Sequence, residues 1–285
     1  MAKLIFGCGY LGTRVAALWR AAGEEVFAVT RSSRRAVAFA ASGLVPVVAD
    51  LAASAELPVP QGVRTVLFAV GYDRQGGKSI HEVYVDGLER VVACLPESVE
   101  KVIYISSTGV YGQVTGNEVD EASPCQPTRE GGKACLAAET LLRASVFADR
   151  SIILRLAGIY GPGRTPRSQD LLAGKPIDAP ATGWLNLIHV EDAARIVLLA
   201  EQLANPPKLY VVSDGRPVIR GDYYRELARL LGAPPPLFVE PAPDSPAAQR
   251  AASDKRVNPR RLFADLQPTL LYPSYREGLA ASLGP

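Results

Sequence analysis

The stretch KLIFGCGYLG, residues 3–12, decides the fold of this chain. A short apolar run leads into three glycines, and a helical pattern follows them. Between a strand and a helix, the first glycine permits a tight turn, the second lets the backbone approach a pyrophosphate, and the third lets the helix pack closely on the strand. The N-terminus of the helix attracts the anion. The alternative is a glycine-rich turn that binds nothing, but this context favours a dinucleotide site at Gly7, Gly9, Tyr10, Leu11 and Gly12.

Outward from this stretch, short apolar runs alternate with helical patterns, as in units where a helix connects two parallel strands. Strands rich in Val, Ile and Phe are expected at Lys3–Phe6, Glu25–Thr30, Val45–Val48, Thr65–Val70, Lys101–Ser106 and Ser151–Leu156. Helices are expected at Leu11–Ala22, Arg34–Ser42, His81–Cys94 and from about Arg129 to Phe147. This order predicts an α/β fold with a Rossmann-type doubly wound parallel sheet.

The character of the sequence changes after Tyr160, where turn-forming Gly and Pro residues gather. We expect residues 1–160 to form an NADP-binding Rossmann domain, and residues 161–285 to form a smaller C-terminal substrate lobe with segments that return to the sheet. Helices at Glu191–Leu203 and Asp222–Leu231 and a strand at Leu209–Ser213 are expected in this second part, and the Pro- and Ala-rich segment Pro241–Asp254 is expected to be a mobile loop.

The composition is that of an ordinary soluble globular protein. Of the 285 residues, 48% are hydrophobic and 21% are charged, and the formal net charge is +2. A charge this small does not favour nucleic acid or a membrane surface as a partner. The four cysteines lack metal-site spacing and are too few for a disulfide framework, so no metal site is expected. With no secretory leader pattern at the start, we expect a cytoplasmic protein.

The end of the second expected strand discriminates between NAD and NADP. An NAD site places an acidic residue there to accept a hydrogen bond from the ribose 2′-hydroxyl. This chain has Arg31 instead, whose guanidinium can bind a 2′-phosphate, and Ser32, Ser33 and Arg34 or Arg35 can add donors. The alternative is that these arginines lie on the solvent-exposed start of a helix and bind no ligand. NADP(H) is therefore favoured over NAD(H), with Asp50 and Leu51 expected at the adenine edge.

Several further stretches resemble one known family. They are ISSTGVYG at 105–112, LRLAGIYGPG at 154–163 and IHVEDA at 188–193, besides the glycine loop and Asp50-Leu51. With these motifs the chain resembles an atypical extended short-chain dehydrogenase/reductase of the NAD-dependent epimerase/dehydratase type, from a branch described as sugar-nucleotide epimerases. The resemblance covers most of the chain.

The resemblance implies an active site with a Ser or Thr after the fifth strand, a Tyr that transfers the proton, a Lys four residues later, and often a helical Asn. Ser107 fills the first role and Lys133 the third. The Tyr position holds Arg129 and the Asn position holds Tyr84. A guanidinium stays protonated in proteins, so Arg129 cannot be the proton-transfer base. An exposed Arg129 at the start of the helix is the plainer interpretation.

Another phenol is a candidate for the missing role. Tyr84 lies on a helix that the family places near its catalytic Lys, and Tyr72 follows the fourth strand, near the expected nicotinamide ribose. Both are also consistent with packing or with a pocket wall. His189 resembles a structural position of the family, and Asp192 is most simply a carboxylate at a helix start.

Two functions from different classes follow. The first is an NADP(H)-dependent epimerase or reductase that acts on a hydroxyl or carbonyl of a small polar or sugar-derived substrate. The second, motivated by the missing Tyr, is a non-catalytic NADP(H)-binding module that signals redox state. The resemblance also implies a homodimer as one possible assembly.

Overall fold

The computed structural model describes residues 1–51 and 57–284. The chain packs into two compact units, and each unit is made of three segments of the sequence. Unit 1 consists of Met1–Val110, Glu130–Arg155 and Ala194–Tyr210, and unit 2 of Tyr111–Arg129, Leu156–Ala193 and Val211–Pro285. The division is interleaved, so a segment that precedes residue 160, Tyr111–Arg129, belongs to unit 2. The described helices are all too short or too polar to cross a membrane.

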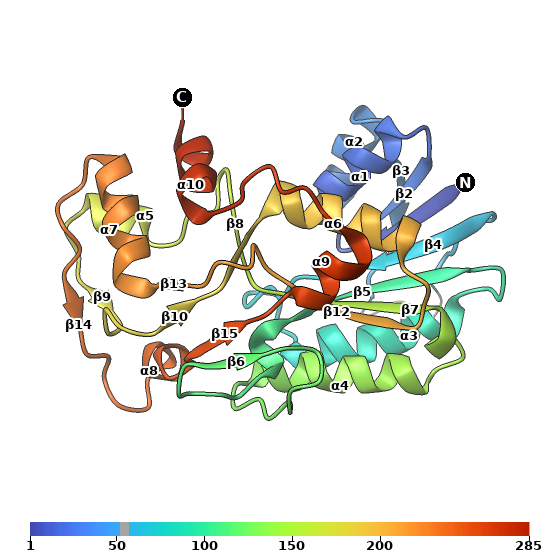
Figure 1. The fold of residues 1–285 in the computed structure, drawn as a ribbon. Helices are drawn as coiled ribbons and strands as arrows, with labels where there is room; N and C mark the ends of the chain where they lie inside the picture. Colours follow the sequence, from blue (N-terminus) through green and yellow to red (C-terminus); the bar gives the residue numbers. More distant parts are fainter. Residues whose placement is uncertain (52–56, 285) are drawn as a thin grey trace. The chain divides into compact units, whose positions relative to one another are not determined.

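A seven-stranded sheet forms the centre of unit 1, in the order β12-β7-β5-β4-β1-β2-β3 (Figure 1). Its strands are β1 (Ala2–Phe6), β2 (Glu25–Thr30), β3 (Val45–Val48), β4 (Val63–Phe68), β5 (Lys101–Ser107), β7 (Ser151–Leu156) and β12 (Lys208–Val212). The pairs β1–β2, β1–β4, β2–β3 and β4–β5 are parallel. The predicted doubly wound α/β fold is confirmed, and every predicted strand is present within two residues at each end.

The helices of unit 1 connect these strands. They are α1 (Gly12–Ala21), α2 (Ser33–Ala41), α3 (Gly87–Cys94), α4 (Glu130–Ala144) and, at the border with unit 2, α6 (Val190–Leu203). In Figure 1, α3 and α4 lie side by side on one face of the sheet, whereas α1 and α2 lie on the other. The helices predicted for this unit are confirmed, with ends that differ by up to three residues, except that the regular helix α3 begins at Gly87 and not at His81.

One predicted helix has an irregular first half. The segment Glu82–Asp86 is a π-helical turn that runs directly into α3. Its start is set by a capping box, because the amide of Glu82 donates to Ser79 Oγ (3.1 Å) and the amide of Ser79 donates to Glu82 Oε2 (2.7 Å). The turn contains Tyr84.

A row of aromatic side chains lies beneath the carboxyl edge of the sheet. Phe6 of β1 is paired in register with Phe68 of β4, and Phe68 with Tyr104 of β5. The ring centroids are 6.4 Å and 6.0 Å apart, and none of the three side chains is more than 2% exposed. Each strand ends within a few residues of this row, so the loops that follow start from a rigid floor.

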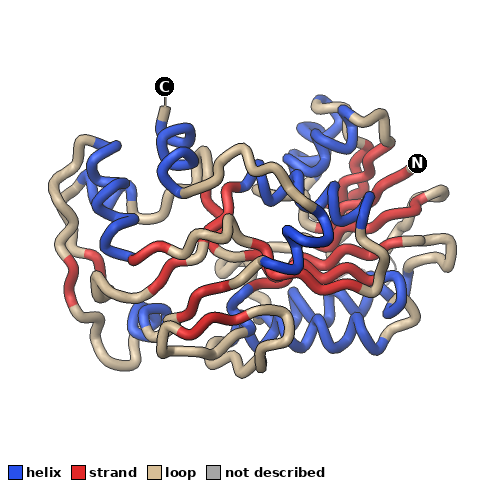
Figure 2. Tube along the Cα trace, viewed as in Figure 1, coloured by secondary structure: helices blue, strands red, loops and turns tan. Residues whose placement is uncertain are grey.

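Unit 2 is built from short strand pairs and helices (Figure 2). The pairs are β6 (Asn117–Val119) with β15 (Lys255–Val257), β8 (Gly158–Tyr160) with β11 (Leu187–His189), β9 (Ile177–Asp178) with β14 (Phe238–Val239), and β10 (Trp184–Leu185) with β13 (Val218–Ile219). The helices are α5 (Ser168–Leu172), α7 (Arg220–Leu231), α8 (Pro246–Ala251), α9 (Arg260–Leu266) and α10 (Tyr275–Leu283). Its core contains Tyr160, Tyr223, Leu227, Tyr275 and Leu279.

The prediction of a loop over Pro241–Asp254 is wrong for its middle part, which forms α8. Ser245 caps this helix, because its side chain accepts a hydrogen bond from the amide of Ala248 (3.1 Å). Pro246 stands in the first turn, where its fixed φ favours a helix and its missing N–H costs nothing. The proline that argued for a loop is therefore a helix start.

Candidate functional site

Residues 7–12, which follow β1 and contain three glycines, are called the phosphate loop here. Two of these glycines, Gly7 and Gly12, cannot be replaced without a steric clash. Gly7 has a φ of +87°, and a Cβ there would lie 2.4 Å from the carbonyl carbon of Ala69. A Cβ on Gly12 would lie 2.6 Å from the carbonyl oxygen of Gly7. A Cβ on Gly9 would meet nothing nearer than 3.9 Å. The fold itself thus explains Gly7 and Gly12, whereas open space lies over Gly9, as the approach of a pyrophosphate requires.

The turn and the helix start are held by hydrogen bonds within the loop. The amide of Gly9 donates to the carbonyl of Gly7 (2.7 Å), and Thr13 donates to the carbonyl of Gly9 from its amide (3.0 Å) and its hydroxyl (2.8 Å). Arg14 packs its guanidinium 4.4 Å from the ring centre of Tyr10. The first turn of α1 contains no acidic residue, so its positive end is available to an anion.

The cysteine of this loop is not a reactive thiol. Cys8 is 2% exposed, and burial raises the pKa of its thiol to about 11, against a smaller opposing effect of the Arg35 charge. The interaction with Arg35 is direct, since its Nη2 donates to the carbonyl oxygen of Cys8 at 2.7 Å. Arg35 therefore ties α2 to the phosphate loop, a role that sequence reasoning missed because it considered Arg35 only as a phosphate donor.

Arg31 stands at the end of β2 with a partner that the sequence did not suggest. Its Nη2 lies 3.0 Å from Oδ2 of Asp73, in the loop that follows β4, and both side chains are more than half exposed. Ser32 caps α2 by accepting a hydrogen bond from the amide of Arg35 (3.3 Å), and Arg34 is exposed. One signal was available: Asp73 follows β4, whose carboxyl end lies at the same edge of the sheet as that of β2.

The two residues expected at the adenine edge follow β3. Asp50 and Leu51 are both partly exposed. The carbonyl oxygen of Leu51 accepts a hydrogen bond from Nη1 of Arg90 in α3 (2.8 Å). This contact fixes the backbone at the point where the chain leaves β3.

The candidate catalytic residues Ser107 and Lys133 lie on elements that pack together. Ser107 ends β5, and its hydroxyl accepts a hydrogen bond from the amide of Gly109 (3.0 Å) in the short turn Thr108–Val110, which packs on α4. Lys133 lies in the N-terminal half of α4, is 55% exposed, and bonds to Glu130 at 2.8 Å. Glu130 is the one partner of Lys133 among the described residues, and because this pair is exposed the lysine can exchange that partner at little cost.

The two candidate phenols, Tyr84 and Tyr72, have different surroundings. The π-helical turn that contains Tyr84 packs on α4, and the ring of Tyr84 lies against the core of unit 1. The hydroxyl of Tyr72 donates to the carbonyl of Lys78 (3.1 Å) within its own loop. Thus the turn of Tyr84, the turn after Ser107 and the helix of Lys133 converge, whereas Tyr72 closes the loop that also contains Asp73.

A buried ionic network anchors α4 to the sheet. Glu139 is fully buried and accepts hydrogen bonds from Nε (2.9 Å) and Nη2 (2.6 Å) of Arg155 in β7, and from the hydroxyl of Ser106 in β5 (2.6 Å). Ser106 directly precedes Ser107. The network therefore determines where the end of β5 lies relative to α4, and with it the placement of Ser107 and Lys133.

Arg129, the residue in place of the expected Tyr, interacts with a buried lysine of unit 2. Lys255 donates from Nζ to the carbonyl of Tyr111 (3.2 Å) and to Ser253 Oγ (2.7 Å). Burial, and after it the charge of Arg129, lowers the pKa of Lys255 to about 8. Arg129 keeps its charge and cannot remove a proton from a hydroxyl, and that charge favours an anion nearby.

His189 and Asp192 hold unit 2 together. The His189 ring is 1% exposed, lies between Tyr160 and Tyr272, and accepts at Nδ1 from the amide of Glu191 (3.3 Å). The Asp192 carboxylate accepts from the amides of Leu271 (2.7 Å) and Tyr272 (3.0 Å). Both side chains serve the packing of α6 against the segment before α10.

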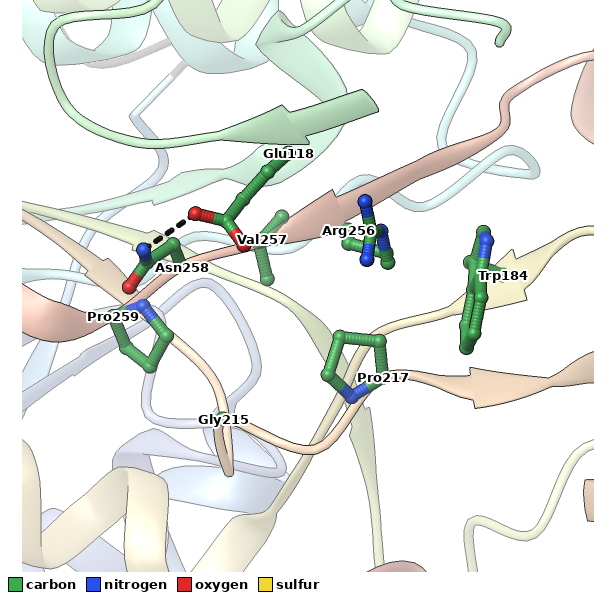
Figure 3. Close-up of a pocket in the computed structure, with 8 residues that line it drawn as sticks. All are labelled: Glu118, Trp184, Gly215, Pro217, Arg256, Val257, Asn258 and Pro259. Carbon is green, nitrogen blue, oxygen red and sulfur yellow. Dashed lines mark hydrogen bonds between the residues drawn. The ribbon is translucent and has the colours of Figure 1, made fainter. Parts of the chain in front are cut away.

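A pocket of about 350 Å³ lies within unit 2 (Figure 3). Arg256 lies over the ring of Trp184, 5.6 Å from its centre, and the side-chain Nδ2 of Asn258 donates to Glu118 Oε1 (2.7 Å) at the opposite end in the view. Pro217 contributes an apolar wall. The two charged groups of the lining already have partners within unit 2, because Arg256 donates to the carbonyl of Gly116 and Glu118 accepts from Asn258.

Comparisons with known proteins agree with this geometry. The sequence profile of the NAD dependent epimerase/dehydratase family matches residues 4–213. Protein YeeZ of Escherichia coli K12 is 33% identical over 158 residues, a match that spans 55% of this chain and only 56% of YeeZ. Short-chain dehydrogenase/reductase family 42E member 1 of Danio rerio is 27% identical, over 79% of this chain and 66% of the relative.

A solved structure is similar over the whole length. It is a conserved protein of unknown function from Silicibacter pomeroyi DSS, with a TM-score of 0.83, 31% identity, and coverage of 99% of this chain and 97% of the other. The match of the family profile covers the phosphate loop, both ends of the sheet and the turn after Ser107. The resemblance expected from the sequence motifs is confirmed: this chain is an extended short-chain dehydrogenase/reductase and belongs to the NAD-dependent epimerase/dehydratase family.

Proposed function

We propose that this protein is an NADP(H)-dependent enzyme of the epimerase/reductase type, which acts on a hydroxyl or carbonyl of a small polar or sugar-derived substrate in the cytoplasm. The observation that carries the proposal is the pairing of an open phosphate loop at Gly9 with Arg31 at the end of β2. The first feature accommodates a dinucleotide and the second selects one with a 2′-phosphate.

The residues around the adenine ribose support the preference for NADP(H). The turn from β2 into α2 offers Arg31, the Ser32 hydroxyl and Arg34, and it contains no carboxylate. Guanidinium groups bind phosphate by charge-assisted hydrogen bonds, often through two N–H groups at once. A carboxylate from β2 would instead repel the phosphate dianion.

The chemistry divides between the bound cofactor and three side chains. NADPH, when bound, supplies a hydride to a carbonyl carbon, and the carbonyl oxygen takes a proton. Ser107 at the end of β5 donates a hydrogen bond to that oxygen, and Lys133 holds the nicotinamide ribose after leaving Glu130. We assign the proton donor to Tyr84 rather than Tyr72, because the turn of Tyr84 packs on the helix of Lys133, whereas Tyr72 lies in the loop that contains Asp73.

Binding and turnover are measured separately. We expect NADPH to bind more tightly than NADH, and Arg31→Gln to remove that difference. In a screen of aldehydes and ketones, including sugar derivatives, we expect NADPH oxidation that Ser107→Ala abolishes. Tyr84→Phe should abolish it as well, with Tyr72→Phe as the matched control that retains it. Tighter binding of NADH, or turnover unaffected by Ser107→Ala, contradicts the proposal.

A second function is favoured by one observation, the arginine at position 129 where the family has its catalytic Tyr. In this alternative the protein binds NADP(H), transfers no hydride, and signals the redox state to a partner. It predicts tight binding of NADPH together with no turnover in the same screen. The binding and turnover assays therefore separate the two functions.

A further inference from the structure

The guanidinium that would bind a 2′-phosphate is already occupied by a carboxylate. Arg31 Nη2 lies 3.0 Å from Asp73 Oδ2, and the two side chains are 57% and 56% exposed. They come from the end of β2 and from the loop that follows β4, and both strands border β1 in the sheet. The pair is thus formed by tertiary structure, at the edge of the sheet where the cofactor is expected.

The loop that presents Asp73 is internally closed. The other carboxylate oxygen, Oδ1, accepts from the amide of Gln75 (3.0 Å), and the amide of Gly76 donates to the carbonyl of Asp73 (3.0 Å). The Tyr72 hydroxyl closes the same loop onto the carbonyl of Lys78. Asp73 is therefore held facing Arg31 by bonds that do not depend on Arg31.

In this arrangement a 2′-phosphate would compete with the Asp73 carboxylate for the Arg31 guanidinium. A phosphate dianion and a carboxylate both accept from the guanidinium fork, and they repel each other at close range. An incoming 2′-phosphate must either displace Asp73 from Arg31 or share the fork with a second anion. NADH has no 2′-phosphate, so its binding does not need the Arg31 guanidinium.

We propose that Asp73 is a specificity-determining residue of the dinucleotide site, which restrains NADPH affinity by competing with the 2′-phosphate for Arg31. This rests on the proposed NADP(H) site and adds a residue that opposes it. With Asp73 present, the ratio of the NADPH affinity to the NADH affinity is smaller than it would be with Arg31 and no Asp73. The protein then binds the two dinucleotides with more similar affinities.

Asp73→Asn is the direct test, with NADPH and NADH titrated by calorimetry in low-salt buffer. Asparagine keeps the oxygen that accepts from Gln75, so the loop retains its turn. We expect NADPH affinity to rise by about two- to tenfold, as removal of an exposed competing charge allows, with NADH affinity unchanged. The gain should shrink at high salt, because both charges are solvent-exposed.

Glu100→Gln is the matched control. Glu100 forms a similar exposed pair with Arg64 (3.2 Å) and immediately precedes β5, at the opposite edge of the same sheet. It removes one negative charge without touching the cofactor edge, so both affinities should stay unchanged. A double variant, Arg31→Gln with Asp73→Asn, tests the competition, because the effect of Asp73→Asn should vanish once Arg31 is gone.

The outcomes separate this inference from the proposed function. If the wild-type protein binds neither dinucleotide, or binds NADH more tightly than NADPH, the NADP(H) proposal fails. If NADPH binds but Asp73→Asn leaves its affinity unchanged or lowers it, the competition is wrong and the NADP(H) site stands. An increase that persists in the Arg31→Gln background also overturns the competition.

Discussion

Arg35 of α2 donates a hydrogen bond from Nη2 to the carbonyl oxygen of Cys8, 2.7 Å away in the phosphate loop. The two residues are 27 positions apart, and β2 lies between them in the chain. The bond joins the part of the site that is expected to bind the pyrophosphate to the part that is expected to bind the adenine ribose. It links the phosphate loop directly to α2, so these two predicted binding regions are held in a fixed relation.

This bond predicts how two arginines differ. Arg35→Gln removes a support of the phosphate loop that any dinucleotide uses, so NADPH and NADH should both bind more weakly, by about three- to thirtyfold. Arg31→Gln should weaken NADPH alone. Titration of both dinucleotides into each variant checks this, and an Arg35→Gln variant that loses only NADPH affinity would show that Arg35 acts on the 2′-phosphate instead.

The phosphate loop predicts a contrast between its glycines. Gly9→Ala should fold with nearly normal stability, because its Cβ meets no atom nearer than 3.9 Å, yet it should bind dinucleotide at least about tenfold more weakly. Gly7→Ala should lose several kcal/mol of stability, since its Cβ falls 2.4 Å from the Ala69 backbone at a φ of +87°. Thermal melts with and without NADPH distinguish the two effects.

The buried network under Ser107 predicts a large loss of stability. Arg155→Met leaves the fully buried Glu139 without its bidentate partner, which typically costs about 3–5 kcal/mol in the free energy of unfolding. Arg143→Met is the control, because Arg143 is 49% exposed and lies 3.6 Å from the same carboxylate, so its loss should cost under about 1 kcal/mol. Urea unfolding of both variants gives the comparison, and equal losses would contradict it.

Asp214 in unit 2 predicts a pH dependence of stability. It is 6% exposed, Oδ1 accepts from the amide of Arg216 (2.9 Å), and Oδ2 has no hydrogen-bond partner among the described residues. Burial, helped by Asp192, raises the pKa of Asp214 from 3.8 to about 7. The folded protein therefore keeps this proton between about pH 4 and 7, where the unfolded chain has released it, and stability falls as pH rises through that range.

Asp214→Asn removes that dependence. The variant should be more stable than the wild type at pH 8, by about 1–3 kcal/mol, and similar at pH 4.5. The melting temperature measured at half-unit pH steps tests it. A wild-type profile and a variant profile that run parallel from pH 4.5 to 8 would show that Asp214 does not carry the charge penalty.

Local sequence patterns predicted most of unit 1 and little of unit 2. The strands of unit 1 are apolar runs bounded by turn formers, and their connecting helices have clear periodicity, so their positions follow from short windows of sequence. The strand pairs of unit 2 contain only two or three residues each. Such segments have no periodicity of their own and form only because a partner from far along the chain is present, as in the pairing of β6 with β15.

What the sequence by itself determined is the phosphate loop, the α/β class and the chemical character of the end of β2. These depend on residues within a few positions of one another, where backbone sterics and periodicity act. Only the tertiary structure decided which side chains meet: Arg31 with Asp73 across 42 positions, Arg35 with Cys8, and Arg155 with Glu139. Such contacts depend on strand order and helix packing, because charged side chains pair with whatever the fold places within reach.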